Sequence, residues 1–129
     1  MNDNINHPSH YQSITLEPID ICEAYRFPLG CAMKYLFRAG LKAGAPLEED
    51  LAKAQWYLTR YLESSTGPAF PSTPVGEREL FSAKVRLLIH DKPYLCALFG
   101  YEERQTLGRI DDEHVCALIA RLDDTLEDD

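Results

Sequence analysis

One stretch of the sequence, residues 47–62, constrains the fold more than any other. Its apolar residues recur at the spacing of a helix, at Leu51, Ala54, Leu58 and Leu62, so they form one stripe that a neighbouring element must cover. The stretch opens with acidic residues 48–50, which suit the positive end of a helix dipole. The sequence therefore predicts an amphipathic helix and a fold made by packing helices together.

Two shorter helices are predicted before this one. Pro18 stands where a helix over residues 18–27 could begin, because the first helical position tolerates the missing N–H. Pro28 is predicted to end that helix, since the residue before proline avoids the α region. A second helix is predicted at residues 29–39, with one apolar stripe and Gly40 as its C-terminal cap.

The remaining segments alternate between polar and helical patterns. Residues 1–14 are polar and lack a helical period, so an extended arm is expected there. Residues 64–76 are rich in Ser, Thr, Gly and Pro, which is typical of a loop. Helices are predicted again at residues 77–90 and 111–126, whereas the apolar segment 95–101 is too short to assign a type.

The expected architecture is mainly α, a small helical bundle with an extended N-terminal arm and a Pro-rich mid-chain loop. With 129 residues and 45% hydrophobic composition, the chain can build a real core. Residues 1–63 form the region with the clearest motifs, residues 64–76 the loop, and residues 77–129 an acidic helical region expected to pack on the first.

The charge distribution limits the partners that the chain can bind. The net charge of −8 argues against binding duplex nucleic acid mainly through its phosphates. No acidic residue lies between Glu23 and Glu48, however, whereas basic residues do. These are Arg26, Lys34, Arg38 and Lys42. A cationic patch on an acidic body suits a small anion better than a long polyanion.

Location and redox chemistry are also constrained. No apolar run is long enough to cross a bilayer and the N-terminus lacks the pattern of a signal peptide, so a soluble cytoplasmic protein with no membrane partner is expected.

The four cysteines form no Cys-x-x-Cys pair and have apolar neighbours. They are predicted to be buried free thiols rather than zinc ligands or a redox motif.

Standard catalytic motifs do not occur in this sequence. It contains no P-loop, no dinucleotide glycine motif, no nucleophile elbow and no His-Glu-x-x-His helix. A familiar enzyme class therefore cannot be assigned from motifs. The chemistry-bearing residues that remain are the basic and aromatic side chains of residues 29–62, together with the histidines of the arm.

Four motifs nevertheless occur in a fixed order in the first half of the chain. They are His7-Pro8-Ser9-His10-Tyr11; Glu17-Pro18-Ile19-Asp20; Leu29-Gly30 leading to Lys34-Tyr35-x-x-Arg38-Ala39-Gly40-x-Lys42; and Asp50-Leu51-x-Lys53-Ala54-x-Trp56-Tyr57-Leu58. Together they resemble a family of small phage and prophage proteins, a SaV-like domain of unknown function, one of whose members is a coliphage nucleotide kinase without a P-loop. The resemblance implies a nucleotide-binding protein, and in its narrower form a kinase that moves a phosphoryl group from ATP to a (deoxy)nucleoside monophosphate.

The matching residues give this expectation a chemical form. The candidate catalytic residues are Lys34, Arg38 and Asp50, and the candidate substrate-binding residues are His10, Tyr11, Tyr35, Lys42, Lys53, Trp56 and Tyr57. Arginine and lysine would hold phosphates, and the aromatic rings would stack on the base. Mg²⁺ would be held by Asp20 or Asp50. Removing Arg38 should then weaken binding and leave stability near normal.

An ordinary structural interpretation of the same residues stays open. Lys34 and Arg38 could pair with the acidic residues 48–50 in surface salt bridges, and the three aromatic residues could belong to the core. Those acidic residues also resemble the magnesium-binding helices of all-α nucleotide pyrophosphohydrolases. The match is poor, because the preceding helix carries cations where a second acidic pair is needed.

The two histidines of the arm have alternative roles. His7 and His10 could begin a metal site with Glu17 or Asp20. Histidines in a polar arm more often hold the arm in place by hydrogen bonds.

The rival function belongs to a different class. A non-catalytic phage protein that binds and inhibits a host protein could use the acidic second half as its interaction surface, and the net charge of −8 suits it. The number of copies in the assembly stays open, and a homo-oligomer is one alternative.

Overall fold

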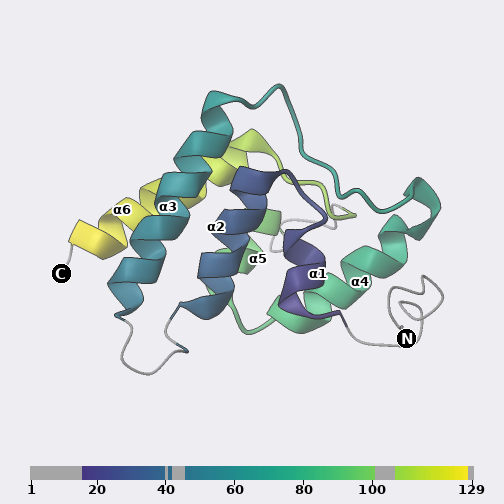
Figure 1. The fold of residues 1–129 in the computed structure, drawn as a ribbon, viewed down its shortest axis with the longest axis horizontal. Helices are drawn as coiled ribbons and strands as arrows, with labels where there is room; N and C mark the ends of the chain where they lie inside the picture. Colours follow the sequence, from purple (N-terminus) through teal and green to yellow (C-terminus); the bar gives the residue numbers. More distant parts are fainter. Residues whose placement is uncertain (1–15, 40, 42–45, 101–106, 128–129) are drawn as a thin grey trace.

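The computed structural model describes residues 16–39, 41, 46–100 and 107–127. These residues form six α-helices and a short 3₁₀ helix (Figure 1), which are α1 Pro18–Cys22, α2 Phe27–Arg38, α3 Leu47–Glu63, η2 Val75–Glu77, α4 Arg78–Ile89, α5 Pro93–Phe99 and α6 Asp112–Glu127. The β structure of the described residues is limited to an isolated bridge between Ala69 and Ile110. The prediction of a mainly α fold is confirmed.

The first predicted helix is wrong at its C-terminal end. α1 ends at Cys22, the chain turns, and α2 begins at Phe27 rather than at Leu29. Pro28 therefore starts α2 instead of ending α1, because the first turn of a helix has N–H groups without partners and proline loses nothing there. α1 is capped at its N-terminus by a capping box in which the Glu17 N–H donates to the Asp20 carboxylate over 2.9 Å.

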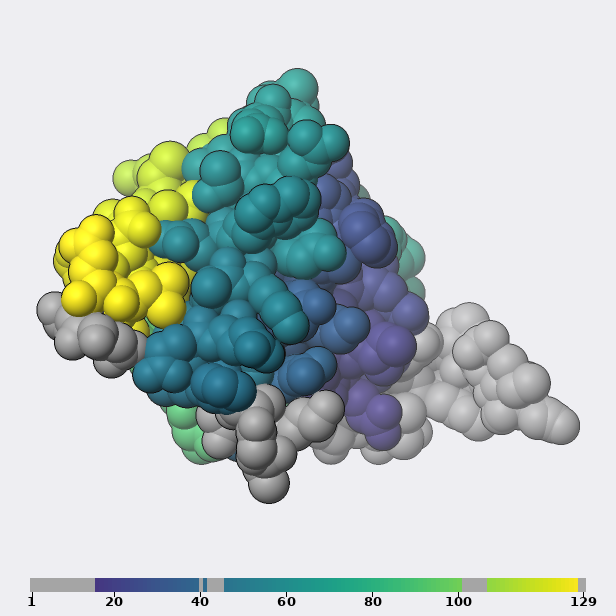
Figure 2. Space-filling model, turned by 60° about the vertical axis from the view of Figure 1, so that its left-hand side comes forward, coloured from purple at the N-terminus to yellow at the C-terminus, as the bar shows by residue number. Residues whose placement is uncertain are grey.

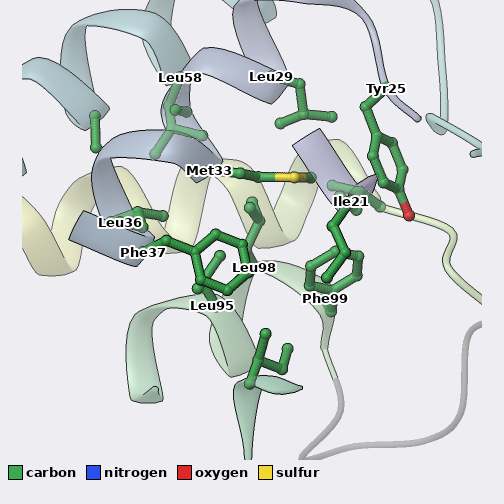
Figure 3. Close-up of a cluster of buried hydrophobic side chains, with 14 of the residues drawn as sticks. Ile21, Tyr25, Leu29, Met33, Leu36, Phe37, Leu58, Leu95, Leu98 and Phe99 are labelled. Atoms are coloured by element: carbon green, nitrogen blue, oxygen red, sulfur yellow. The ribbon is translucent and has the colours of Figure 1, made fainter. Parts of the chain in front are cut away.

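The long predicted helix is confirmed as α3, and it lies antiparallel beside α2 (Figure 1). Both helices turn apolar stripes into one core. From α2 come Leu29, Ala32, Met33, Leu36 and Phe37, and from α3 come Leu51, Ala54, Leu58 and Tyr61. Figure 3 shows Met33 and Phe37 of α2 directed toward Leu95, Leu98 and Phe99 of α5. The apolar spacing that predicts these two helices also defines the faces that they bury.

The second half of the chain packs on this helix pair. The predicted helices at residues 77–90 and 111–126 are α4 and α6, and the unassigned segment 95–101 corresponds to α5, which ends at Gly100 in the left-handed region with φ of 69°. The Gln55 side chain of α3 donates to the Ile119 carbonyl (3.2 Å) and the Asp123 carboxylate (2.6 Å) of α6. The core contains residues from both halves of the chain.

The mid-chain loop is anchored to both halves by backbone hydrogen bonds. The Ser72 N–H donates to the Ala24 carbonyl (2.8 Å), and Ala69 and Ile110 exchange two bonds of 2.8 Å. Because these bonds join loop residues to segments far away in sequence, they fix the path of the loop over the helices.

The four cysteines are free thiols, as predicted, but their burial is not as predicted. Cys22, Cys31 and Cys96 are half-buried, and Cys116 is exposed because α6 turns Val115 and Leu118 inward instead. Burial, and secondarily the neighbouring Cys31, raises the pKa of Cys22 to about 11. Cys22 therefore stays in its thiol form at neutral pH and behaves as a small apolar side chain.

A helix that crosses a bilayer must be long and apolar. None of the helices in the described part of the chain is both long enough and apolar enough to cross a bilayer.

A buried hydrogen bond between distant segments gives the first testable prediction. The Tyr25 hydroxyl donates to the Gly108 carbonyl over 2.6 Å, and Tyr25→Phe leaves that carbonyl without this donor. We expect unfolding free energy to fall by roughly 1–3 kcal/mol, measured by urea denaturation. Tyr94→Phe is the matched control, because its hydroxyl lies 3.4 Å from Thr125 Oγ1 in a partly exposed contact. Equal effects of the two changes would contradict the assignment.

Candidate functional site

Four aromatic side chains gather where α2 and α3 lie side by side, and we call them the aromatic cluster. Tyr57 is at its centre. The Tyr57 ring stacks on Tyr35 with centroids 6.0 Å apart and planes 14° apart, and it meets the rings of Trp56 (5.0 Å) and Phe27 (6.5 Å) edge to face. Such offset and edge-to-face arrangements are the favourable geometries of aromatic rings. The cluster comprises Phe27, Tyr35, Trp56 and Tyr57.

Much of this cluster is open to solvent. Trp56 is 62% exposed and Phe27 is 75% exposed, while Tyr35 and Tyr57 are half-buried against the core. The interpretation of Trp56 as a core residue is therefore wrong, since α3 buries the opposite face. Large exposed aromatic rings that touch one another are a feature of binding surfaces.

Two lysines lie beside this cluster. The Lys34 and Lys53 ammonium nitrogens are 5.4 and 5.5 Å from the centroid of the Tyr35 ring, so they are at most about 11 Å from each other. Lys53 also lies 3.8 Å from Glu49, but both side chains are well exposed and such pairs contribute little. Lys34 forms no ion pair with any residue that the structure describes.

Arg38 and Asp50 form an ion pair at the same helix interface. Arg38 Nε is 3.5 Å from Asp50 Oδ1, and the Asp50 side chain is 1% exposed while that of Arg38 is 34% exposed. Neither Asp50 oxygen accepts a hydrogen bond from the described residues. The predicted pairing of Arg38 with the acidic start of α3 is thus confirmed for Asp50. A buried carboxylate without hydrogen bonds depends on the charge of its neighbour.

The two carboxylates predicted to hold Mg²⁺ have different surroundings. Asp20 accepts the capping bond of α1, and Asp50 faces Arg38. The described residues contain no group of three His, Cys, Asp or Glu side chains that could hold a metal ion.

Three of the predicted substrate-binding residues, His10, Tyr11 and Lys42, lie outside the described residues, as does His7. The other four, Tyr35, Lys53, Trp56 and Tyr57, are brought together with the predicted catalytic residue Lys34.

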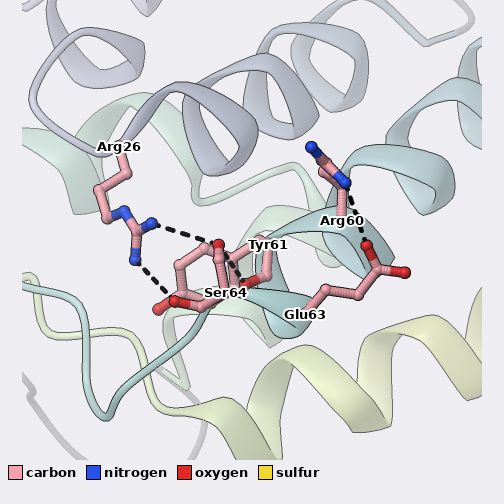
Figure 4. A network of polar contacts seen from close by, with 5 residues as sticks. All are labelled: Arg26, Arg60, Tyr61, Glu63 and Ser64. Atoms are coloured by element: carbon pink, nitrogen blue, oxygen red, sulfur yellow. Dashed lines mark hydrogen bonds and ion pairs between the residues drawn. The ribbon is translucent and has the colours of Figure 1, made fainter.

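Sequence reasoning missed Phe27 as a site residue, and it named Arg26 only as part of a cationic patch without giving it a place in the site. The dipeptide Phe27-Pro28 is the signal that could have found Phe27, because a helix that starts there places residue 27 on the same face as residues 34 and 35. The Arg26 guanidinium donates to the Ser64 carbonyl (3.3 Å) and hydroxyl (3.2 Å) and lies 6.0 Å from the Tyr61 ring centroid (Figure 4). Arg26 is thereby held at the C-terminal end of α3.

α3 lies at the surface of the molecule. Figure 2 shows α3 in the middle of one face, with α6 in yellow to its left. Because the aromatic cluster, Lys34 and Lys53 come from α2 and α3, they belong to a surface formed by two consecutive helices.

Comparison with known proteins finds a match for the first half of the chain only. No curated protein and no solved structure matches this sequence. The resemblance over the four motifs is confirmed at the level of a domain of unknown function. Residues 5–59, which include the whole aromatic cluster, Lys34 and Lys53, match the family described as a protein of unknown function (DUF3310).

Proposed function

We propose that the surface formed by α2 and α3 binds a nucleotide. The observation that carries this proposal is the convergence of an exposed tryptophan and two lysine ammonium groups on a stacked pair of tyrosines. A nucleotide has a flat aromatic base and an anionic phosphate separated by a sugar. The aromatic rings of the site suit the base, and the two lysine ammonium groups suit the phosphate.

The base would stack on Trp56, beside Tyr57 and Tyr35 of the aromatic cluster. Trp56 is largely exposed, and Tyr57 and Tyr35 hold their positions because they pack partly against the core. Stacking of one base on an aromatic side chain contributes about 1–3 kcal/mol and tolerates different bases. Stacking on Trp56 therefore supports binding without a strong base preference.

The phosphates would lie between Lys34 and Lys53. Both ammonium groups are within 6 Å of one ring, so an anion placed there meets two positive charges. Arg38 follows Lys34 by one helical turn and keeps part of its side chain exposed, while Asp50 neutralises some of its charge. Lys42, His10 and Tyr11 would add contacts according to the resemblance.

The narrower form of the proposal is a phage-type (deoxy)nucleoside monophosphate kinase. Lys34 and Arg38 would neutralise the phosphoryl group that passes from ATP to an oxygen of the monophosphate. Mg²⁺ fits the described residues poorly, because Asp20 caps α1 and Asp50 is buried beside Arg38. Nucleotide binding is therefore the central proposal, and transfer from ATP is its extension.

Calorimetric titration with a nucleoside and with its mono- and triphosphate tests the proposal. Lys34→Ala and Lys53→Ala should each weaken triphosphate binding by about 1.5–3 kcal/mol, roughly ten- to a hundred-fold, because each removes a charge-assisted contact. Binding of the nucleoside should change little. Formation of ADP from ATP and a monophosphate tests the kinase form separately.

The matched control is Arg121→Ala. Arg121 of α6 lies 5.1 Å from the Tyr94 ring centroid, so it is also a cation beside a tyrosine, but on a different helix. It should leave affinity unchanged. Nucleotide binding that is absent from the parent protein, or equal in the parent and both lysine variants, would refute the proposal.

A second candidate is a non-catalytic protein that binds and inhibits a host protein. The exposed face of α4 favours it, because Leu80, Ala83 and Leu87 follow one another there at helical spacing. This surface is separate from the aromatic cluster. It becomes the better account if the parent protein binds no nucleotide.

A further inference from the structure

The binding surface extends beyond the reach of a single nucleotide. Phe27 is the most exposed member of the aromatic cluster, and its ring meets Tyr57 on the side that α2 provides at its first residue. Arg26 stands just before it, held by Ser64. Neither residue is needed to bind the base and phosphates of one nucleotide at Trp56, Lys34 and Lys53.

The groups follow one another along the α2–α3 pair. Arg26 and Phe27 lie at the start of α2, Tyr57 joins Phe27 to Tyr35, and Lys34 and Lys53 flank the Tyr35 ring. The eight residue steps from Arg26 to Lys34 correspond to about 12 Å of helix. Stacked nucleotides of one strand repeat at about 3.4 Å. The surface is therefore long enough for several nucleotides.

The local charge along this surface also suits a polyanion of several phosphates. α2 contains no acidic residue. Arg26 and Lys34 form no ion pair with the described residues, and the pairs Lys53–Glu49 (3.8 Å) and Arg60–Glu63 (3.4 Å) are exposed and weak. The rest of the chain is acidic and repels the phosphates of duplex DNA. The bases of a duplex are also stacked on one another, so aromatic side chains cannot stack on them.

We infer that this surface binds single-stranded nucleic acid, with successive bases against Trp56, Tyr57 and Phe27 and the backbone along Arg26, Lys34 and Lys53. Exposed rings interleaved with cations are the features by which proteins bind single strands without strong sequence preference. The inference rests on the proposed function, because it extends the same base and phosphate contacts from one nucleotide to several.

Fluorescence anisotropy with a labelled eight-nucleotide DNA strand tests this inference, with unlabelled mononucleotide as a competitor and calorimetry for mononucleotide affinity. The octamer should bind at least ten-fold more tightly than the mononucleotide. Each phosphate contact adds about −0.7 to the slope of log K against log salt, so the octamer slope should be at least twice that of the mononucleotide.

Phe27→Ala separates the two ligands. It should weaken octamer binding roughly five- to 150-fold, because one stacking contact is lost, and leave mononucleotide affinity unchanged. Leu87→Ala is the matched control, since Leu87 is an apolar side chain of similar exposure (72%) on α4. It should change neither affinity. Both side chains are exposed, so both variants should keep the parent melting temperature.

Each outcome of this experiment either supports or overturns the inference that the surface binds single-stranded nucleic acid. The inference is overturned if the octamer binds no more tightly than the mononucleotide. It is also overturned if Phe27→Ala and Leu87→Ala bind the octamer with equal affinity. Either result leaves nucleotide binding intact. Absence of binding by both ligands overturns the inference and the proposed function together, and a protein partner on the exposed face of α4 then becomes the better account. Duplex DNA that binds as tightly as the single strand also overturns it.

Discussion

Arg38→Ala is expected to destabilise the protein by about 3 kcal/mol, because it leaves the Asp50 carboxylate buried without a counter-charge. Asp50 is 1% exposed, and neither of its oxygens accepts a hydrogen bond from the described residues. Breaking a buried ion pair from one side typically costs 3–5 kcal/mol, and about 3 is appropriate because Arg38 is one-third exposed. Urea denaturation of parent and variant measures the effect.

A second substitution distinguishes the unpaired charge from lost packing by the arginine side chain. Asp50→Asn in the Arg38→Ala background removes the charge and keeps the shape, so we expect it to recover part of the lost stability. Stability of Arg38→Ala equal to that of the parent would contradict the importance of the pair. No recovery in the double variant would mean that the Arg38 stem, rather than its charge, contributes the stability.

Gly30→Ala is expected to have an effect of similar size through a different cause. A Cβ at residue 30 would lie 2.3 Å from the Cys22 carbonyl oxygen and 3.2 Å from its carbonyl carbon. Because these are backbone atoms, α1 and α2 must move apart. We expect a net loss of about 2–3 kcal/mol, after the gain of about 1 kcal/mol that alanine gives a helix.

Gly76→Ala provides the control for this prediction. A Cβ at residue 76 meets nothing within 4 Å, and the residue lies in η2 away from the core. Its unfolding free energy should stay within about 0.5 kcal/mol of the parent value. If Gly30→Ala were as stable as Gly76→Ala, the close approach of α1 and α2 would not exist in solution.

Helical spacing predicts most of the fold because buried stripes dominate the choice of structure. α3 follows its apolar residues, and the second half contains helices where periodic apolar residues indicate them. The error at residues 18–27 has a local cause. Proline can end one helix or start the next, and with only one residue between Phe27 and Leu29 the sequence contains no feature that decides between them.

The candidate site is predictable only in part. Lys53 and Tyr57 are four residues apart on one predicted helix, so they share a face. Antiparallel packing of that helix on the preceding one can bring this face beside Lys34 and Tyr35, so part of the grouping follows from the helix assignments. Exposure of Trp56 does not follow, because an aromatic residue on a helix can face the core or the solvent depending on what packs beside it. The role of Phe27 was hidden by the misplaced helix boundary.

The pairing of Arg38 also depends on three-dimensional structure. Sequence alone leaves open whether Arg38 binds a phosphate or forms a surface salt bridge with residues 48–50, and in both interpretations its loss leaves stability near normal. The structure places it beside Asp50 at 3.5 Å, so the opposite outcome is now expected. Its partner could have been any of the three acidic residues that open α3, and only packing selects Asp50, which is the buried one.

Trp56 fluorescence tests the central claim most directly, because it is the only tryptophan of the chain and belongs to the aromatic cluster. Titration with a nucleoside triphosphate should give a saturable change in emission, and Lys34→Ala should shift the midpoint at least ten-fold to higher concentration. The same titration with inorganic phosphate controls for anion effects without a base. Emission that stays constant at saturating nucleotide, or a midpoint unaffected by Lys34→Ala, would contradict a nucleotide site on α2 and α3.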